Sequence, residues 1–282
     1  MKLLVVALSM LILPSASALG DTEGPNRVVS MNACADQLAM LISRDGQLYS
    51  VSALAADPAG SVLAEEAKRY VLNNGFAEEI FMMRPDLVLA GTYTARTSVA
   101  MLRRLGIRVE DLPPTNTFAE IRAQLRRVGH LLGRIQRAEE LVAELDGQLS
   151  AMTLPKSGER RPLAALHYFN NYTSGSGTLA GEIVALSGFR NLGTELGLVG
   201  TVHLPLERLI MAEPDVIIAE NKTEDVQIHV YDSFDHSALQ KATSGKPFVS
   251  IPDKYWVCGA PFTVEAVRML AREARAARES TQ

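Results

Sequence analysis

The chain has 282 residues, of which 47% are hydrophobic and 21% are charged, a composition typical of a globular protein with a substantial core. Its formal net charge of −4 argues against nucleic acid as the main partner, because nucleic-acid-binding surfaces carry an excess of Lys and Arg. The sequence contains no Gly-x-Ser-x-Gly elbow, no Walker-type phosphate loop and no His-Glu-x-x-His pair, so we do not expect an enzyme.

The first residues have the pattern of a secretory signal. Lys2 precedes an apolar run over residues 3–13, which is too short to span a membrane comfortably, and Ala16-Ser17-Ala18 forms a cleavage site of small residues. We therefore predict a signal peptide over residues 1–18 and export to the periplasm. A buried N-terminal helix is the alternative.

An α/β lobe is predicted next, over residues 25–133. Short β-rich runs alternate with segments of helical spacing in the following order: strand 27–32, helix 33–42, strands 48–54 and 86–91, helix 98–105 and strand 107–112. Strands that alternate with helices indicate a mainly parallel sheet.

A helical region separates this lobe from a second one. Residues 118–152 contain no proline and have apolar residues at three-to-four spacing, which predicts two helices, the second being a connecting helix over residues 134–153. The α/β pattern then resumes over residues 160–282, with strand 163–168, helix 180–186, a last strand at 247–252 and a terminal helix over 263–278. A stiff helical connector predicts limited rocking of the lobes rather than wide hinge closure.

Two segments about a domain's length apart read almost alike. Residues 78–90 and 207–219 each have an acidic start, a short apolar run, a Pro-Asp turn (Pro85-Asp86 and Pro214-Asp215) and an aliphatic strand. The repeat indicates two lobes of similar construction. The predicted fold class is α/β, with two Rossmann-like lobes built on mainly parallel sheets, one long bridging helix and a cleft between the lobes.

The order of these motifs resembles a known family. The motifs are Arg27-Val-Val-Ser-Met-Asn with Asp36, Arg84-Pro-Asp-Leu-Val, Gly188-Phe-Arg-Asn191, Glu213-Pro-Asp-Val-Ile and the segment from Trp256 to Pro261. Together they resemble the periplasmic substrate-binding proteins of ABC importers for iron chelates, haem and cobalamin, in which one long helix joins two lobes. The resemblance implies a monomer without a cofactor, which captures cobalamin or a ferric chelate such as a siderophore or haem and delivers it to an ABC permease at the inner membrane. The opening Asn-Ala-Cys-Ala-Asp looks most like the cobalamin type.

The ligand site is expected at the loops beyond the carboxyl ends of the strands, where open α/β sheets bind ligands. Rigid aromatic and amide side chains gather there and suit a large flat ligand, although core packing is an alternative for each aromatic residue. Arg96 suits an anionic chelate, or is an ordinary surface residue. The candidates are Asn32, Cys34, Tyr93 and Arg96 in the first lobe and Tyr168, Asn170, Tyr172, Asn221, Trp256 and Cys258 in the second.

The two cysteines allow three interpretations. Cys34 and Cys258 fall on loops of opposite lobes, so they form a disulfide across the cleft, ligate a soft metal as thiolates, or remain isolated buried thiols. The second interpretation gives an alternative function, an exported metallochaperone or thiol-redox protein. A bare-metal site built on histidine is not expected, because no histidine falls on a predicted loop of the first lobe.

Glu78 and Glu207 occupy equivalent places at the start of the two repeat copies. The resemblance implies that one exposed carboxylate on each lobe docks on arginines of the permease, and Glu182 is a further candidate in the second lobe. Both glutamates also suit the N-terminal ends of helices, where the macrodipole favours a negative charge.

Overall fold

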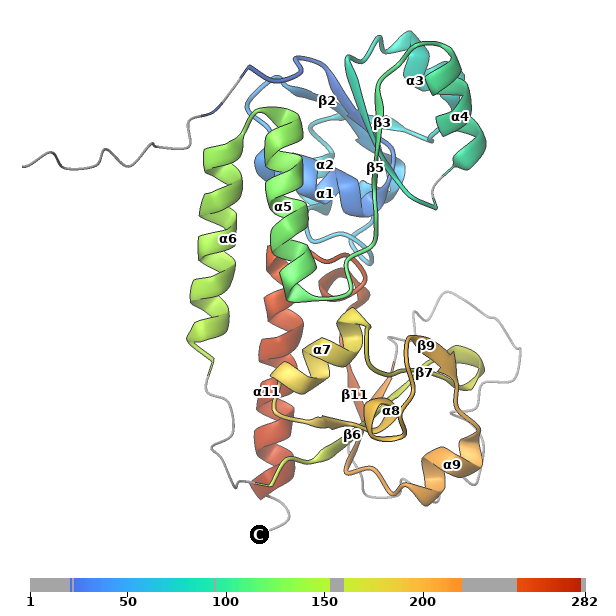
Figure 1. Ribbon diagram of the computed structural model, residues 1–282, viewed down its shortest axis with the longest axis vertical. Helices are drawn as coiled ribbons and strands as arrows, with labels where there is room; N and C mark the ends of the chain where they lie inside the picture. Colours follow the sequence, from blue (N-terminus) through green and yellow to red (C-terminus); the bar gives the residue numbers. More distant parts are fainter. Residues whose placement is uncertain (1–20, 22, 94, 153–159, 220–247, 280–282) are drawn as a thin grey trace, which may run out of the picture.

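The computed structural model describes residues 21, 23–93, 95–152, 160–219 and 248–279. It has two α/β lobes, one above the other in Figure 1, joined by helices along one side. This arrangement confirms the predicted fold class. The predicted signal peptide lies outside the described residues, and in the part of the chain that is described no helix is long and apolar enough to cross a membrane.

The N-terminal lobe has a five-stranded parallel sheet in the order β3-β2-β1-β4-β5. The strands are β1 (Val28–Ser30), β2 (Leu48–Ser52), β3 (Val71–Asn73), β4 (Leu87–Gly91) and β5 (Val109–Leu112). The helices are α1 (Ala33–Ile42), α2 (Ala64–Ala67), α3 (Ala77–Met82) and α4 (Arg96–Arg104), and a 3-10 turn covers Ala53–Ala56. β3 and α2, of three and four residues, were not predicted from the sequence.

Both faces of this sheet are covered. Val28 and Leu89 pack on the side of α1, whereas Val29 and Val88 pack on the side of α3 and α4. Successive strand residues point to opposite faces, so a strand buried on both sides reads as a continuous apolar run. The Val-Val and Leu-Val-Leu-Ala runs were recognisable as strands for this reason.

The C-terminal lobe has a four-stranded parallel sheet in the order β11-β10-β6-β8 and a separate antiparallel pair, β7-β9. The strands are β6 (Leu163–His167), β7 (Tyr172–Ser174), β8 (Arg190–Asn191), β9 (Thr201–His203), β10 (Val216–Ala219) and β11 (Phe248–Ser250). The helices are α7 (Leu179–Leu186), α8 (Leu192–Glu195), α9 (Leu206–Met211) and α11 (Val264–Glu279), with 3-10 turns at Phe169–Asn171, Asp253–Tyr255 and Pro261–Thr263.

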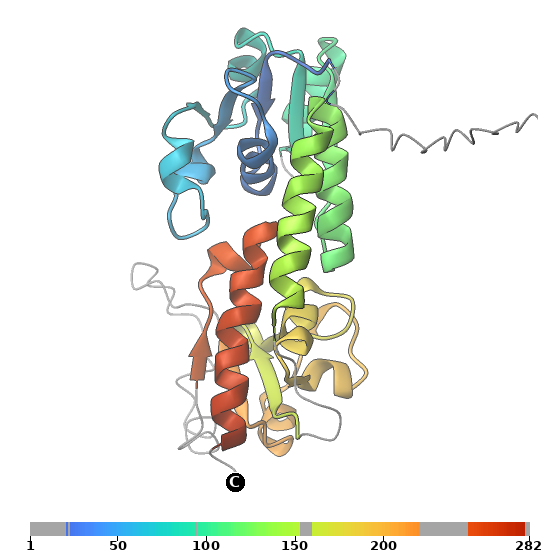
Figure 2. The same cartoon turned by 90° about the vertical axis from the view of Figure 1, so that its left-hand side faces the viewer.

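The connection between the lobes consists of α5 (Phe118–Leu132) and α6 (Ile135–Ser150). The connecting helix was predicted over residues 134–153; α6 begins and ends inside that range and, with 16 residues, is about 24 Å long. Gly133, with a φ of 69°, ends α5 in the left-handed conformation that favours glycine. Figure 2 shows α11 running beside α6, so the two lobes are held by more than one helix.

One hydrophobic core runs through both lobes. It includes Val28 in the N-terminal sheet, Leu125 and Leu141 in the connecting helices, and Val216 and Val267 in the C-terminal lobe. Opening the lobes would expose part of this core to water, at about 25 cal/mol per Å² of apolar surface. The packing therefore opposes any wide hinge motion that separates the two lobes.

The Pro-Asp turns have a second role that the sequence did not reveal. The Asp86 carboxylate accepts hydrogen bonds from the backbone N–H groups of Asn26 and Arg27, which immediately precede β1. In the second copy, Asp215 accepts a hydrogen bond of 2.7 Å from the N–H of Leu163, the first residue of β6. Besides shaping its turn, each aspartate thus links two neighbouring strands: Asp86 connects β4 to the start of β1, and Asp215 connects β10 to the start of β6.

Candidate functional site

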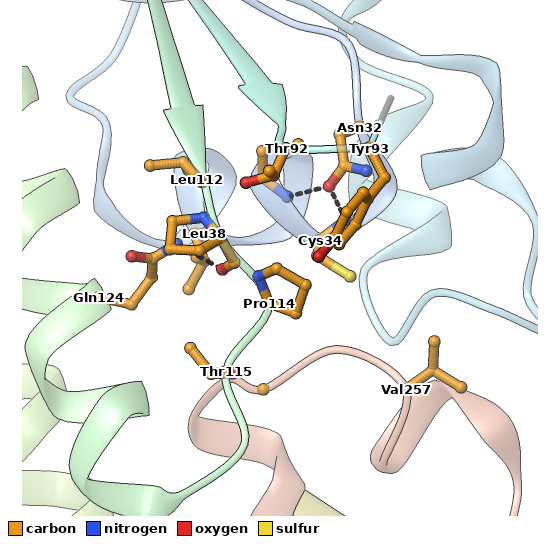
Figure 3. A pocket seen from close by; sticks show the side chains of 14 residues that line it. Asn32, Cys34, Leu38, Thr92, Tyr93, Leu112, Pro114, Thr115, Gln124 and Val257 are labelled. Carbon is orange, nitrogen blue, oxygen red and sulfur yellow. Dashed lines mark hydrogen bonds between the residues drawn. The ribbon is translucent and has the colours of Figure 1, made fainter. Parts of the chain in front are cut away.

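A pocket of about 180 Å³ lies between the lobes, at the carboxyl ends of β1, β4 and β5 (Figure 3). Most of its wall comes from the N-terminal lobe, and Val257 and Gly259 contribute from the C-terminal lobe. The lining residues are Asn32, Cys34, Ala35, Leu38, Gly91, Thr92, Tyr93, Leu112, Pro113, Pro114, Thr115, Gln124, Val257 and Gly259.

The turn between β1 and α1 has a fixed conformation. Asn32 is the N-cap of α1, and its Oδ1 atom accepts hydrogen bonds of 3.1 Å from the N–H groups of both Cys34 and Ala35. These bonds satisfy two of the backbone N–H groups that a helix N-terminus leaves unpaired. The turn therefore presents Cys34 to the pocket without needing a ligand to order it.

Cys34 and Cys258 form a disulfide that joins the two lobes. Their Cα atoms lie 5.1 Å apart, and 224 residues separate them in the sequence. Cys34 lines the pocket, whereas Cys258 is only 3% exposed and its carbonyl accepts a hydrogen bond from Thr263 Oγ1. Sulfur atoms in a disulfide are not thiolates, so this form of the protein does not offer the soft-metal ligands of the alternative interpretation.

Two further contacts join the lobes beside the disulfide. Gly259 packs so closely on the N-terminal lobe that an added Cβ would lie 1.8 Å from Thr115 Oγ1. The Glu182 carboxylate accepts a hydrogen bond of 2.7 Å from the N–H of Phe118, the first residue of α5. Glu182 was a further docking candidate in the second lobe; its half-buried carboxylate instead takes this hydrogen bond at the junction of the lobes.

The polar groups around the pocket are uncharged. Thr92 and Thr115 contribute hydroxyl groups and Asn32 and Gln124 contribute amides, and Tyr93, which is 79% exposed, also lines the pocket (Figure 3). Among the described residues that line the pocket, none carries a charge. Such a wall suits a ligand whose nearby groups are neutral hydrogen-bonding groups.

Asn32, Cys34 and Tyr93 are the sequence-predicted residues that line the pocket, and Cys258 adjoins it between Val257 and Gly259. Arg96 is the exposed first residue of α4 and does not line the pocket. Asn221 lies outside the described residues.

The aromatic candidates of the second lobe lie elsewhere. Trp256 is only 8% exposed and belongs to the core, with its Nε1 atom donating to Asp253 at 3.2 Å. Tyr168 packs edge-on against Trp256, at 6.2 Å between ring centroids. Tyr172 packs against His203 in the β7-β9 pair, and Asn170 lies in the exposed 3-10 turn before it. For Trp256 the structure favours the core-packing alternative.

Several lining residues were missed by the sequence analysis. Pro113, Pro114 and Thr115 directly follow β5, so the rule that ligands bind beyond strand ends would have found them had it been applied to that strand. Gln124 and Gly259 carry no such signal, because only the packing of α5 and of the loop after Trp256 brings them to the pocket.

Asp36, which follows the lining residue Ala35 on α1, is fully buried. Its Oδ2 atom accepts hydrogen bonds from the hydroxyl and the N–H of Ser52. Burial raises the pKa of Asp36 to about 6 and outweighs the hydrogen bonds from Ser30 and Ser52, which lower it.

This raised pKa makes stability depend on pH. The folded state holds the Asp36 proton more tightly than the unfolded state, so the free energy of unfolding falls as pH rises through the window from about 4 to about 6. We expect the variant Asp36→Asn to gain about 2 kcal/mol relative to the wild type between pH 4.5 and pH 7.5, measured by urea unfolding at both pH values. An equal difference between variant and wild type at the two pH values would contradict the assignment.

Two α/β lobes with parallel sheets, joined by helices and with a pocket at their junction, have the architecture of a two-lobed solute-binding protein. The chain belongs to the periplasmic binding protein family, whose profile matches residues 28–254. This is a family of solute-binding proteins rather than enzymes.

Individual relatives agree with this assignment. A cobalamin-binding protein of Halobacterium salinarum is 26% identical over 206 residues, which cover 70% of this chain and 54% of the relative, so the chain matches about half the length of that protein. The periplasmic haem-binding protein RhuT from Roseiflexus has a TM-score of 0.69 at 21% identity, covering 92% of this chain and 100% of the other. The periplasmic vitamin B12-binding protein BtuF of Vibrio cholerae has a TM-score of 0.64 at 18% identity, covering 90% and 98%. Identities this low in the solved structures indicate a shared fold alone.

Proposed function

We propose that this protein captures a corrinoid in the periplasm and delivers it to an ABC permease, with residues 1–18 directing its export. The observation that carries the choice of ligand is that the described residues of the pocket wall are all uncharged. The periphery of a corrinoid is rich in carboxamides, which the hydroxyl of Thr92 and the amide of Gln124 can match with hydrogen bonds.

Two of the competing ligand classes, haem and ferric catecholates, need a different wall. Haem carries two carboxylates and ferric catecholates are anions, and such groups are bound in proteins by Arg or Lys, because a buried charge needs a partner. The described lining of the pocket contains neither residue. The name of the Halobacterium relative, a cobalamin-binding protein, supports the same choice.

The size of the pocket indicates how the ligand would lie. Its volume of about 180 Å³ is smaller than the range of roughly 300–1,000 Å³ common for small-molecule sites, so it would receive one edge of a corrinoid. Tyr93 and Val257, which are 79% and 66% exposed, are placed to contact the remainder at the opening.

A ligand panel tests this function. Purified protein would be heated with cyanocobalamin, haemin, a ferric hydroxamate or a ferric catecholate, and unfolding followed by circular dichroism. Cyanocobalamin at a hundred times its dissociation constant should add about 2.7 kcal/mol to the free energy of unfolding and raise the Tm. Stabilisation by haemin or a ferric chelate, without stabilisation by cyanocobalamin, would overturn the choice of ligand.

The repeat supplies the proposed docking surface. Glu78 on α3 and Glu207 on α9 are both exposed, and each is followed one helical turn later by a highly exposed methionine, Met82 (77%) and Met211 (82%). Residues four apart lie on the same face of a helix. Figure 1 shows α3 and α9 on the side of the molecule away from α6, one on each lobe. A matched carboxylate and thioether on each lobe suit a two-fold symmetric partner with cationic side chains next to apolar surface.

Charge reversal separates docking from ligand capture. We expect the double variant Glu78→Arg/Glu207→Arg to bind cyanocobalamin like the wild type but to support cobalamin transport at least about tenfold more slowly, because like charges would meet at the permease. Transport would be measured in proteoliposomes that contain the ABC permease of the source organism.

The matched control is Glu140→Arg/Glu144→Arg, which makes the same change of charge on the exposed face of α6. Equal transport by the two double variants would contradict the docking assignment.

A further inference from the structure

The disulfide is part of the wall of the pocket. Cys34 lines the pocket directly, and both neighbours of Cys258 in the sequence, Val257 and Gly259, line it from the other lobe. The bond therefore joins two segments that a ligand in the pocket would contact together, and it lies at the site rather than at a distant place in the fold.

Apart from the disulfide, the loop that carries Cys258 is held to the N-terminal lobe by apolar packing. The hydrogen bonds that hold this loop run within its own lobe, from Trp256 and Val257 to Asp253 and from Thr263 to Cys258. Across the junction, Gly259 packs against Thr115 and Ile121, and Trp256 and Ala260 belong to the core shared with α5. Val257, in contrast, is 66% exposed, so cleavage of the disulfide would loosen the pocket wall on the side of Val257.

The two sulfur atoms differ in their accessibility. Cys258 is 3% exposed, whereas Cys34 is half-buried and faces the pocket (Figure 3). A small dithiol reductant would therefore reach Cys34 Sγ from the pocket. Its thiolate forms a bond to Cys34 Sγ and expels the Cys258 thiolate; its second thiolate then closes a ring and expels the Cys34 thiolate. The protein gains two electrons and two protons, and the dithiol becomes a cyclic disulfide.

We propose that ligand binding and the redox state of the Cys34–Cys258 disulfide are coupled: the oxidised protein holds the pocket in its binding form, and a bound ligand protects the disulfide from reduction. The inference rests on the proposed ligand site. Two separate effects act in the same direction. Reduction loosens the wall on the side of Val257 and weakens binding, and by linkage a ligand that prefers the oxidised form stabilises it by the same factor. A ligand in the pocket also covers Cys34 Sγ and slows the attack of the reductant.

Two measurements on the purified protein test the coupling. The first is the affinity for cyanocobalamin of the oxidised protein and of protein reduced with dithiothreitol and desalted anaerobically. We expect the reduced form to bind about tenfold more weakly, which corresponds to about 30 mV in the two-electron reduction potential. The second is the rate at which dithiothreitol releases thiols, which should fall about tenfold when cyanocobalamin is saturating.

The double variant Cys34→Ser/Cys258→Ser provides the control. It should bind with the weaker affinity of the reduced wild type, and reductant should not change that affinity; circular dichroism would verify that it is folded. If the variant does not fold, the measurements on oxidised and reduced wild type decide alone. Equal affinities of the two forms together with an unchanged rate of reduction would overturn the coupling. If the oxidised protein does not bind cyanocobalamin at all, the proposed function fails instead, so the two failures are distinguishable.

Discussion

Replacing both cysteines, in the variant Cys34→Ser/Cys258→Ser, should lower the free energy of unfolding by about 2–4 kcal/mol. The disulfide closes a loop that includes most of the chain, since 224 residues separate the two cysteines, and such a link restricts the unfolded state strongly. Chain-entropy reasoning alone would give about 5 kcal/mol for so long a loop, which we take as the upper limit.

Urea unfolding of the wild type, with and without reductant, and of the variant measures this effect. The reduced wild type and the variant should unfold at the same urea concentration, lower than that of the oxidised protein, because both lack the same bond. A variant that is as stable as the oxidised wild type would show that the disulfide contributes nothing to holding the lobes together.

The second large effect is expected at Gly259. The variant Gly259→Ala places a Cβ 1.8 Å from Thr115 Oγ1 and 2.9 Å from Ile121 Cγ1, so the loop or these two side chains must shift. Overpacking of this kind costs about 1–3 kcal/mol of stability, and the shift also alters the pocket wall. We therefore expect a lower Tm and weaker binding of cyanocobalamin.

A double-mutant cycle identifies the contact responsible. Thr115→Ala removes the oxygen that the new Cβ would strike and leaves the Thr115 Cβ at a tight 3.1 Å, so Gly259→Ala should be much less harmful in the Thr115→Ala background. If Gly259→Ala costs the same in both backgrounds, the close approach to Thr115 is not the reason for glycine at this position.

Hydrophobic patterning was sufficient to predict the architecture. The continuous apolar runs that became β1, β4 and β10 are buried in parallel sheets, and α5 and α6 show the three-to-four spacing of packed helices. The Pro-Asp repeat correctly predicted two lobes of similar construction. In β3, Val71 and Leu72 are exposed and only Asn73 is buried, so this strand lacks the buried apolar run that marked β1 and β10.

The site was harder to predict from the sequence, because it depends on contacts between residues that are distant in the chain. Trp256 was singled out as the chain's one tryptophan near a strand end, but sequence does not distinguish a core residue from a pocket residue at such a position. Glu182 has the local signature of an exposed helix start, yet its partner is Phe118, 64 residues earlier. The approach of Gly259 to Thr115 likewise joins segments that only the folding of both lobes brings together.

Calorimetric titration with cyanocobalamin tests most directly whether the uncharged pocket between the lobes binds a corrinoid. The oxidised wild type should bind one cyanocobalamin per chain. Thr92→Trp, which fills the pocket from the end of β4, should bind at least about a hundredfold more weakly, because the blocked pocket can no longer enclose the edge of the ligand. Val199→Trp, at a position that is 71% exposed and outside the pocket lining, should bind like the wild type. Absence of binding by the wild type, or equal binding by Thr92→Trp, would contradict the account.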